Sequence, residues 1–281
     1  MADIKLSAFA DEYSSSLDGQ IQGLSSLGIK YIEVRSLDGK NISKMSADEV
    51  SAAKQKLDDA GITVSAIGSP LGKIRLDGDL GEHMEKAKHV FETANGLGAR
   101  YVRMFSFYAP EGKNIVDMKD VVVDALGEML RIARQHGVVL CHENEAKIYG
   151  DMPSRCRELL DIFGGELKCV FDMGNFVLEG VDPYPEAYEL LREYIAYFHI
   201  KDALAAGAVV PPGCGEAKIK QILDAHREYA KNDFFVSLEP HLQTFSGLNA
   251  LVGREFDNPY KYPDQETAFC DAVQKFRELR Q

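Results

Sequence analysis

Amphipathic stretches that end in glycine recur along the first half of the chain. In each of them, apolar residues lie three or four positions apart, and the glycine separates them from a short apolar segment. Glycine readily adopts the left-handed conformation that ends a helix. The pattern therefore predicts helices that stop at glycine and lead through short loops into strands. Four such junctions occur, at Leu27-Gly28-Ile29, Ala60-Gly61-Ile62, Leu97-Gly98-Ala99 and His136-Gly137-Val138.

Short segments rich in β-branched and aromatic residues follow these glycines, and similar segments recur further along the chain. This composition is typical of buried strands. Stretches with helical spacing lie between them. Ser46 to Glu49 has the pattern of a capping box, Asp182-Pro183 is a favourable helix start, and further helices are predicted at 218–229 and around Phe269. The predicted strands are 4–9, 31–34, 62–67, 101–105, 138–141, 169–171, 197–200 and 234–238.

The alternation of strands and helices predicts an α/β fold of the (β/α)₈ type, a TIM barrel. Eight strand–helix units in 281 residues leave about 35 residues per unit, as in such barrels. An open, doubly wound sheet is the alternative, because alternation alone does not distinguish closed from open sheets. No Gly-x-Gly-x-x-Gly motif follows the first strand, which disfavours that alternative. We expect one barrel domain over residues 1–281.

Polar residues stand at the ends of four consecutive predicted strands: Glu143, Asp172, His199 and Glu239. Catalytic groups of TIM barrels lie at these strand ends, and neighbouring strands can direct them to one point. One such residue alone is an ordinary solvated strand end, but four in succession favour a site. Three converging carboxylates repel one another unless a cation neutralises them. Oxygen ligands with one imidazole suit Mn²⁺ best, with Mg²⁺, Co²⁺ and Zn²⁺ as alternatives.

Composition narrows the classes of function. The formal net charge of −12 repels nucleic acid phosphates, so we expect no nucleic acid partner. No apolar run approaches the roughly 18 residues of a membrane span, and the N-terminus lacks the layout of a signal peptide. The five cysteines are odd in number and form no C-x-x-C pair, which points to a reducing cytoplasm and excludes a thiolate zinc site. A cytoplasmic enzyme acting on a small molecule is expected.

The strand-end motifs resemble those of the sugar isomerase/epimerase superfamily with the xylose isomerase-like barrel. This superfamily includes D-tagatose 3-epimerase, hydroxypyruvate isomerase, inosose dehydratase and endonuclease IV. The resemblance implies that the four strand-end residues bind one divalent metal ion, and that Glu143 and Glu239 also act as catalytic acid and base. It is carried by YIEVRS with Glu33, HENE with Glu143, FDMGNF with Asp172, FHIKD with His199 and SLEPH with Glu239.

Metal-assisted proton transfer next to a carbonyl is the chemistry that such a site performs. A cis-enediolate forms when the α-proton leaves. Return of a proton to this intermediate gives an epimer or an isomer of a sugar, keto-sugar or sugar phosphate. The alternative is a lyase or dehydratase that uses the same metal site on a keto-polyol or keto-glycoside. An abasic-site endonuclease is disfavoured by the acidic charge and by the few strand-end histidines. A catalytically silent sugar-binding barrel is a further alternative.

Four residues near the strand ends are candidate substrate contacts, each with a structural alternative. Asn175 could instead cap the chain after its strand, and Lys201 could form a salt bridge with Asp202 or another nearby carboxylate. His241 has the same parity as Glu239. Arg103, like Arg35, could pair with a core carboxylate such as Glu33. His142 has the opposite parity to Glu143, so we expect it to be a packed, hydrogen-bonded histidine.

Two loops are further candidates. Pro212 to Gly215 precedes a predicted helix where barrels often bind phosphate, although a simple turn is the favoured interpretation because no Arg or Lys precedes the glycines nearby. Residues 243–262 form a long connection between the last strand and the last helix. Loops of this length are usually functional or interfacial, so a lid over the sugar or a contact in a homo-oligomer is expected. Asn175 and the HIKDA segment depart from the pattern of D-tagatose 3-epimerase and leave the substrate open.

Overall fold

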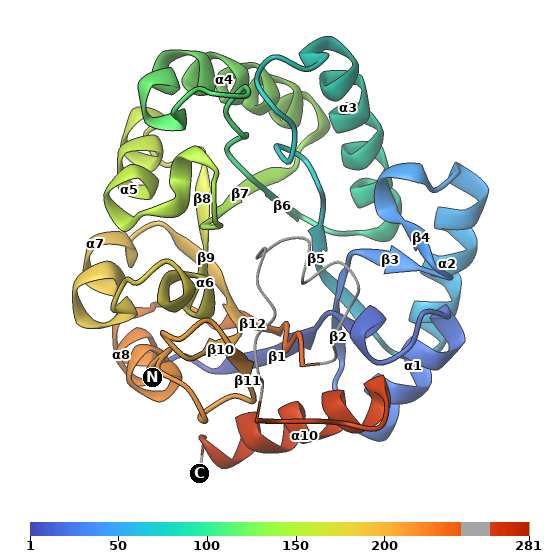
Figure 1. The fold of residues 1–281 in the computed structure, drawn as a ribbon. Coiled ribbons are helices and arrows are strands. Elements are labelled where there is room, and N and C mark those ends of the chain that lie inside the picture. The colour runs from blue at the N-terminus through green and yellow to red at the C-terminus, as the bar shows by residue number, and fades with distance from the viewer. Residues whose placement is uncertain (243–258, 281) are drawn as a thin grey trace.

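The computed structural model describes residues 1–242 and 259–280, and eight parallel strands form the centre of the fold (Figure 1). They hydrogen-bond in the order β1-β12-β9-β8-β7-β6-β5-β2, so each pair is adjacent as a (β/α)₈ barrel requires. The predicted fold is therefore confirmed. The strands are β1 Ile4–Ala8, β2 Tyr31–Val34, β5 Thr63–Gly68, β6 Tyr101–Met104, β7 Val139–Glu143, β8 Lys168–Asp172, β9 Ile195–Ile200 and β12 Phe234–Leu238.

The barrel is nearly closed between its two end strands. β1 and β2 lie side by side at the seam, and side chains connect the strands there. Ser65 on β5 donates a hydrogen bond to the carbonyl oxygen of Ile32 on β2, and its Oγ lies 2.7 Å from Oγ of Ser7 on β1. All three residues are buried. These hydrogen bonds tie three strands together across the interior where the backbone ladder ends.

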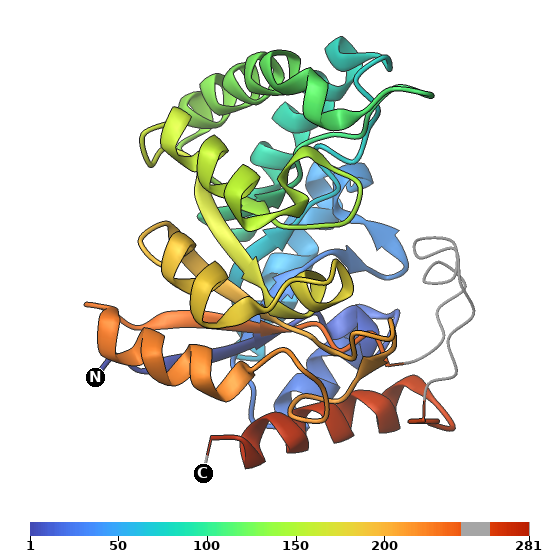
Figure 2. The same cartoon turned by 60° about the vertical axis from the view of Figure 1, so that its left-hand side comes forward.

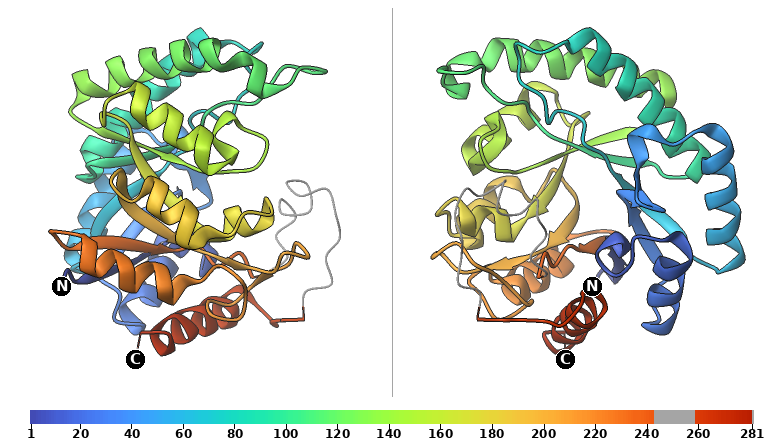
Figure 3. Two further views of the ribbon diagram at one scale, coloured as in Figure 1. Left: turned by 90° about the vertical axis from the view of Figure 1, so that its left-hand side faces the viewer. Right: turned by 45° about the vertical axis from the view of Figure 1, so that its right-hand side comes forward.

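Helices cover the outside of the barrel, and α10 packs beside α1 (Figures 2 and 3). Short hairpins, β3 Ser36–Leu37 with β4 Lys40–Asn41 and β10 Asp202–Ala203 with β11 Val209–Val210, follow β2 and β9. The helices are α1 Leu17–Ser26, α2 Ala47–Asp59, α3 Leu80–Leu97, α4 Lys119–His136, α5 Pro153–Ile162, α6 Met173–Leu178, α7 Tyr188–Leu191, α8 Ile219–Tyr229 and α10 Gln265–Glu278.

Local sequence signals explain most helix ends. The four predicted glycines have positive φ angles, between 64° at Gly28 and 74° at Gly98, and the capping box between Ser46 and Glu49 is present.

The prediction of a regular helix that starts at Asp182-Pro183 is wrong. Tyr184 is extended there, because a residue that precedes proline is kept out of the helical region, and only a short turn and α7 follow.

A small group of apolar side chains lies inside the barrel. Ala66, Cys141, Val170 and Tyr197 point into the barrel and form a small apolar cluster, separate from the large core between barrel and helices. His142, whose parity is opposite to that of Glu143, is buried and hydrogen-bonded as predicted, with its Nε2 2.9 Å from Ser106 Oγ. This apolar cluster lies below the charged groups, which gather at the carboxyl ends of the strands.

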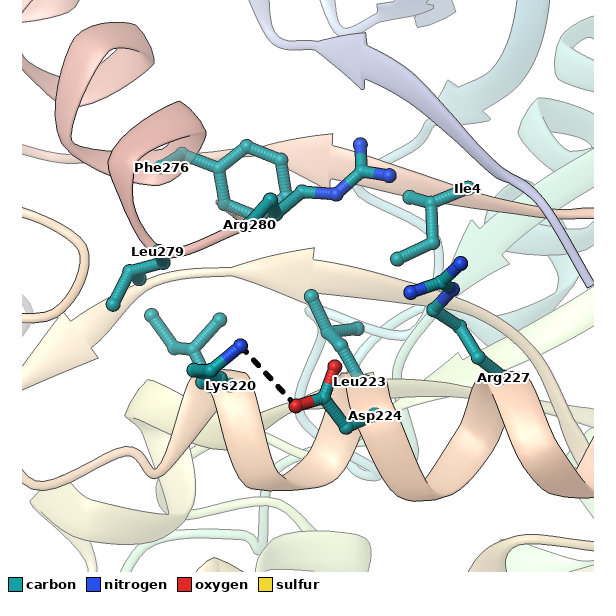
Figure 4. A pocket seen from close by; sticks show the side chains of 9 residues that line it. Ile4, Lys220, Leu223, Asp224, Arg227, Phe276, Leu279 and Arg280 are labelled. Atoms are coloured by element: carbon teal, nitrogen blue, oxygen red, sulfur yellow. Dashed lines mark ion pairs between the residues drawn. The ribbon is translucent and has the colours of Figure 1, made fainter. Parts of the chain in front are cut away.

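Two further observations concern the outside of the barrel. Across residues 1–242 and 259–280, no helix combines the length and the apolar character that a membrane crossing requires. A cavity between α8 and α10, bordered by Ile4, Arg227 and Phe276, has a volume of only about 20 Å³ (Figure 4). A single water molecule fills such a space, so this cavity holds no substrate.

His226 on α8 makes the stability of the fold depend on pH. Its ring packs against Phe198 and Phe234, with centroids 4.8 and 4.7 Å away, and burial lowers its pKa to about 4 from a usual value of 6.5. A folded-state pKa below the unfolded value adds stability that is present above pH 6.5 and is lost as pH falls towards 4. We expect His226→Gln to remove a pH-dependent part on the order of 1–3 kcal/mol. Urea unfolding of both proteins between pH 7 and 4 measures it, and parallel pH profiles would contradict this account.

Candidate metal centre

Four adjacent strands bring the predicted quartet together. Glu143 ends β7, Asp172 ends β8, His199 lies near the end of β9, and Glu239 follows β12. Asp172 pairs with His199 in the register of the sheet. All four side chains are buried, and each offers one ligand atom such that these atoms lie within 4.8 Å of one another. A cluster with this donor set could hold a metal ion.

His199 is oriented by the carboxylate of Glu33, which comes from β2 across the barrel. Its Nε2 lies 3.1 and 3.2 Å from the two Glu33 oxygens, so Nε2 carries the proton and donates. Its Nδ1 then faces Glu143 Oε1 at 3.1 Å and Glu239 Oε2 at 3.4 Å. Burial opposes a charge on the ring, but the carboxylates of Glu33 and Glu143 outweigh burial and raise the pKa of His199 well above its usual value.

Glu33 also accepts a hydrogen bond from the hydroxyl of Tyr197, at 2.8 Å. The predicted pairing of Arg103 and Arg35 with core carboxylates is confirmed, but their partners are Glu143 and Glu239 and not Glu33. Arg103 instead forms an ion pair with Glu143, with 3.3 Å between Nε and Oε2. The register explains this, because Arg103 lies opposite Cys141 and its long side chain reaches the next inward residue of β7.

Glu143 lies between two positive groups, His199 and Arg103. Its Oε1 also accepts a hydrogen bond from the neutral amide of Asn175, at 3.3 Å from Nδ2, and its Oε2 faces Arg103. Burial alone would raise the pKa of Glu143, but His199 and Arg103 lower it to about 2. Among the described residues, neither Glu143 Oε2 nor Arg103 Nε makes a well-aligned hydrogen bond.

Lys201 contacts the other two carboxylates of the quartet. Its Nζ lies 2.9 Å from Asp172 Oδ2, 3.0 Å from Glu239 Oε2 and 3.2 Å from Asn175 Oδ1. The predicted salt bridge of Lys201 with a nearby carboxylate is confirmed. The other predicted partner, Asp202, instead accepts hydrogen bonds from backbone N–H groups of the loop that follows it. Burial raises the pKa of Asp172 to about 7, although Lys201 opposes the shift. The other oxygen of Asp172 accepts from the backbone N–H of Asn175, so Asp172 caps α6, whereas the alternative prediction gave the capping role to Asn175. The Asn175 side chain instead contacts Glu143 and Lys201.

Arg35 binds the second oxygen of Glu239. Its Nη1 lies 3.0 Å from Glu239 Oε1, while Asp11 receives two hydrogen bonds from the same guanidinium at 2.9 and 3.0 Å. Glu12 and His241 complete this network, with 3.2 Å between Glu12 Oε1 and His241 Nε2. Glu12, Glu239 and His241 also have metal-type donors within reach of one another, but the Arg35 guanidinium already contacts all three.

Two phenylalanine rings form the wall beside these arginines. The Phe9 ring lies 4.7 Å from the Arg35 guanidinium and 5.6 Å from that of Arg103, and its edge meets His199. The Phe105 ring lies 4.6 Å from Arg103 and 4.2 Å from Lys73 Nζ. Phe9 and Phe105 are fully buried. Such cation–π contacts hold long cationic side chains in one orientation.

The prediction did not name Asp11, Glu12, Phe9 or Phe105 as part of the site. All four follow the ends of β1 or β6, so the strand-end rule that found the quartet also indicates them. The predicted lid or oligomer contact at 243–262 lies mostly outside the described residues.

Comparisons with known proteins agree with this architecture. A family model described as xylose isomerase-like TIM barrel matches residues 21–256. The probable 3-DHS dehydratase AsbF from Bacillus anthracis has a TM-score of 0.70 at 19% identity, over 90% of this chain and 96% of that one. The IOLI protein with a bound zinc atom has a TM-score of 0.73 at 19% identity, over 98% and 97% of the two chains. D-psicose 3-epimerase from Clostridium cellulolyticum H10 has a TM-score of 0.73 at 14% identity, over 98% of each chain.

A curated 8-amino-7-oxononanoate synthase from Lysinibacillus sphaericus is 37% identical over 82 residues. The match covers 27% of this chain and 21% of that protein, so it spans about a fifth of the relative and carries no argument about function. The solved structures share the fold at low identity, and the family model covers most of the chain. The chain belongs to the xylose isomerase-like TIM barrel family.

Proposed function

We propose that this protein is a divalent-metal-dependent isomerase or epimerase of keto-sugars, with Mn²⁺ as the metal ion. The observation that carries the proposal is the convergence of Glu143, Asp172, His199 and Glu239 from four adjacent strands. Sugar epimerases and a dehydratase are among the proteins with the same fold, which supports an enzyme of this general class. The five free cysteines fit the reducing cytoplasm in which we place it.

The donor atoms of the quartet fit a divalent cation. His199 Nδ1 and Glu143 Oε2 are buried and have no hydrogen-bond partner among the described residues. Leaving buried polar atoms unpaired is costly, so a group that binds both would stabilise the site. Carboxylate oxygens have two lone pairs each, so the contacts of Asp172 and Glu239 with Lys201 leave room for a further ligand. His199 donates from Nε2 to Glu33, so a cation that displaces the Nδ1 proton would find the imidazole correctly oriented as a ligand.

Glu143 and Glu239 are the proposed acid and base. They come from β7 and β12, which β8 and β9 separate, so they approach a substrate from two sides. A bound divalent cation supplies Lewis-acid stabilisation of the enediolate. Glu143 is proposed to take the α-proton, and Glu239 to return one on the other side. Return of the proton to the same carbon gives epimerisation, and return of the proton to the neighbouring carbon gives isomerisation.

Four residues are proposed to hold the substrate. Arg103 has an unpaired Nε donor, and Lys201 and Asn175 present polar atoms next to the quartet. His241 is partly exposed beside Glu239. Hydroxyl and carbonyl oxygens of a sugar match these donors and fix its orientation. Loss of a β-substituent from the same intermediate would make the enzyme a lyase, which the fold shared with the 3-DHS dehydratase keeps as the second candidate.

Replacement of Glu33 by glutamine tests the orientation of His199. Glutamine has similar size but holds the Nε2 proton less strongly, so His199 becomes a weaker ligand. We expect Glu33→Gln to weaken Mn²⁺ binding by about 10–100-fold while the protein stays folded. Isothermal titration with Mn²⁺ measures the change, and Glu128→Gln on the outer surface of α4 is the matched control. Equal affinities of Glu33→Gln and wild type would show that this contact does not position a metal ligand.

Replacement of each acid/base glutamate tests the reaction. We expect Glu143→Gln and Glu239→Gln each to slow solvent deuterium exchange into keto-sugars by at least about 100-fold, because glutamine carries no proton in turnover. Metal content is determined for each variant, so that loss of the ion and loss of the base are separated. Glu128→Gln should exchange at the wild-type rate. Wild-type turnover by both site variants would refute the assignment, and an enone product from the wild type would establish the lyase alternative.

A further inference from the structure

We infer that the substrate is an uncharged keto-sugar, one with neither a phosphate nor a carboxylate group; this inference rests on the proposed function. TIM barrels frequently bind phosphate with the loops that follow strands seven and eight of the barrel. Here the seventh barrel strand is β9, and the loop after it runs from Ala203 to Lys218. Two independent features of the described residues argue against an anionic substrate.

The first feature is an anion-binding loop whose donors are already used. Asp202 is buried and accepts hydrogen bonds from four backbone N–H groups of this loop. Burial raises the pKa of Asp202, and these donors oppose the shift. A ring of convergent amides is the arrangement that binds phosphate. The donors are Gly213 at 2.7 Å, Ala203 at 2.9 Å, and Gly215 and Ala217 at 3.0 Å.

The geometry of the loop keeps Asp202 in this position. A Cβ atom at Gly215 would lie 2.3 Å from Asp202 Oδ1, so only glycine allows the backbone to come this close. Gly213 has a φ angle of 86°. Lys218, the cation at the end of the loop, turns away and pairs with Asp182. The turn interpretation of Pro212 to Gly215 is thus correct, and the chain's own carboxylate occupies the place of a phosphate.

The second feature is the pairing of the cations around the quartet. Arg103 pairs with Glu143, Lys201 with Asp172 and Glu239, and Lys73 with Glu145 at 3.1 Å. Arg35 pairs with Asp11, Glu12 and Glu239. Within the described part of the chain, each of these four cations therefore has a carboxylate partner. A phosphate or carboxylate on the substrate would have to displace one of these partners and would meet its negative charge.

The remaining donors suit neutral oxygen atoms. Arg103 Nε is buried and lacks a well-aligned acceptor, and its charge is already balanced by Glu143. A hydroxyl or carbonyl oxygen accepts from this N–H without adding charge to the site. The buried rings of Phe9 and Phe105 pack against this guanidinium and keep the donor in place. Uncharged sugars supply neutral acceptors of this kind in their hydroxyl and carbonyl oxygens.

Matched sugar trios test the inference on the Mn²⁺-loaded wild type. Solvent deuterium exchange is followed by NMR for D-fructose, D-fructose 6-phosphate and D-fructuronate, and for the corresponding three derivatives of D-tagatose. The phosphate or carboxylate of the charged sugars would face the carboxylates that already pair with the cations of the site. We therefore expect kcat/KM for the charged sugars to be about 100-fold lower than for the free sugar. Faster exchange with a phosphate or a uronate than with its free sugar overturns the inference. No exchange with any of the six compounds counts against the proposed function instead.

A binding measurement decides the question without turnover. Thermal unfolding of wild type, Asp202→Ala and Asp224→Ala is compared in inorganic phosphate and in chloride of equal ionic strength. Asp224 pairs with Lys220 on the surface of α8, so its variant is a matched control for charge. We expect phosphate to stabilise Asp202→Ala alone, because removal of the carboxylate frees the four amides. Specific stabilisation of the wild type by phosphate overturns the inference, and this result stands even if Asp202→Ala does not fold.

Discussion

The structure depends on one electrostatic constraint, the burial of three carboxylates and an imidazole at a single point inside a barrel. Uncompensated buried charges are too costly for a folded protein. The chain meets this cost by surrounding the quartet with Arg35, Arg103 and Lys201, each of which contacts one or two of the carboxylates. His199 Nδ1 and Glu143 Oε2 take part in ion pairs but make no well-aligned hydrogen bond among the described residues. The four ligand atoms of the quartet are where we propose the divalent cation binds.

The rest of the barrel serves to hold this arrangement still. The apolar cluster around Tyr197 lies below the charged groups, and the Tyr197 hydroxyl fixes Glu33, which in turn orients His199. Phe9 lies against both arginines and against the His199 ring. Such supporting contacts keep reacting groups in place without movement during the reaction. On the outer side, Asp202 holds the loop that follows β9. Its carboxylate thereby limits which substrates the same face of the barrel accepts.

Much of the fold and the core of the candidate site could be predicted because they follow from local rules. Glycine stops, helical spacing and strand composition predict the units, and the strand-end rule brings Glu143, Asp172, His199 and Glu239 together. The partners of Arg103 and Glu33 depend on which strands face each other across a closed barrel, and a linear pattern does not contain the register. The contact of Asp202 with the amides before α8 depends on the path of the loop. Asp11 and Glu12 follow β1 directly, so the same strand-end rule also indicates them.

The central claim is that the quartet holds a single divalent cation. Equilibrium dialysis of the wild type against Mn²⁺, followed by metal analysis, tests it most directly, with His199→Ala measured in parallel. The account predicts one bound ion per wild-type chain and none in the variant, because removal of the imidazole takes away the donor that Glu33 orients. Absence of stoichiometric metal in the wild type, or full retention of the ion by His199→Ala, would contradict it.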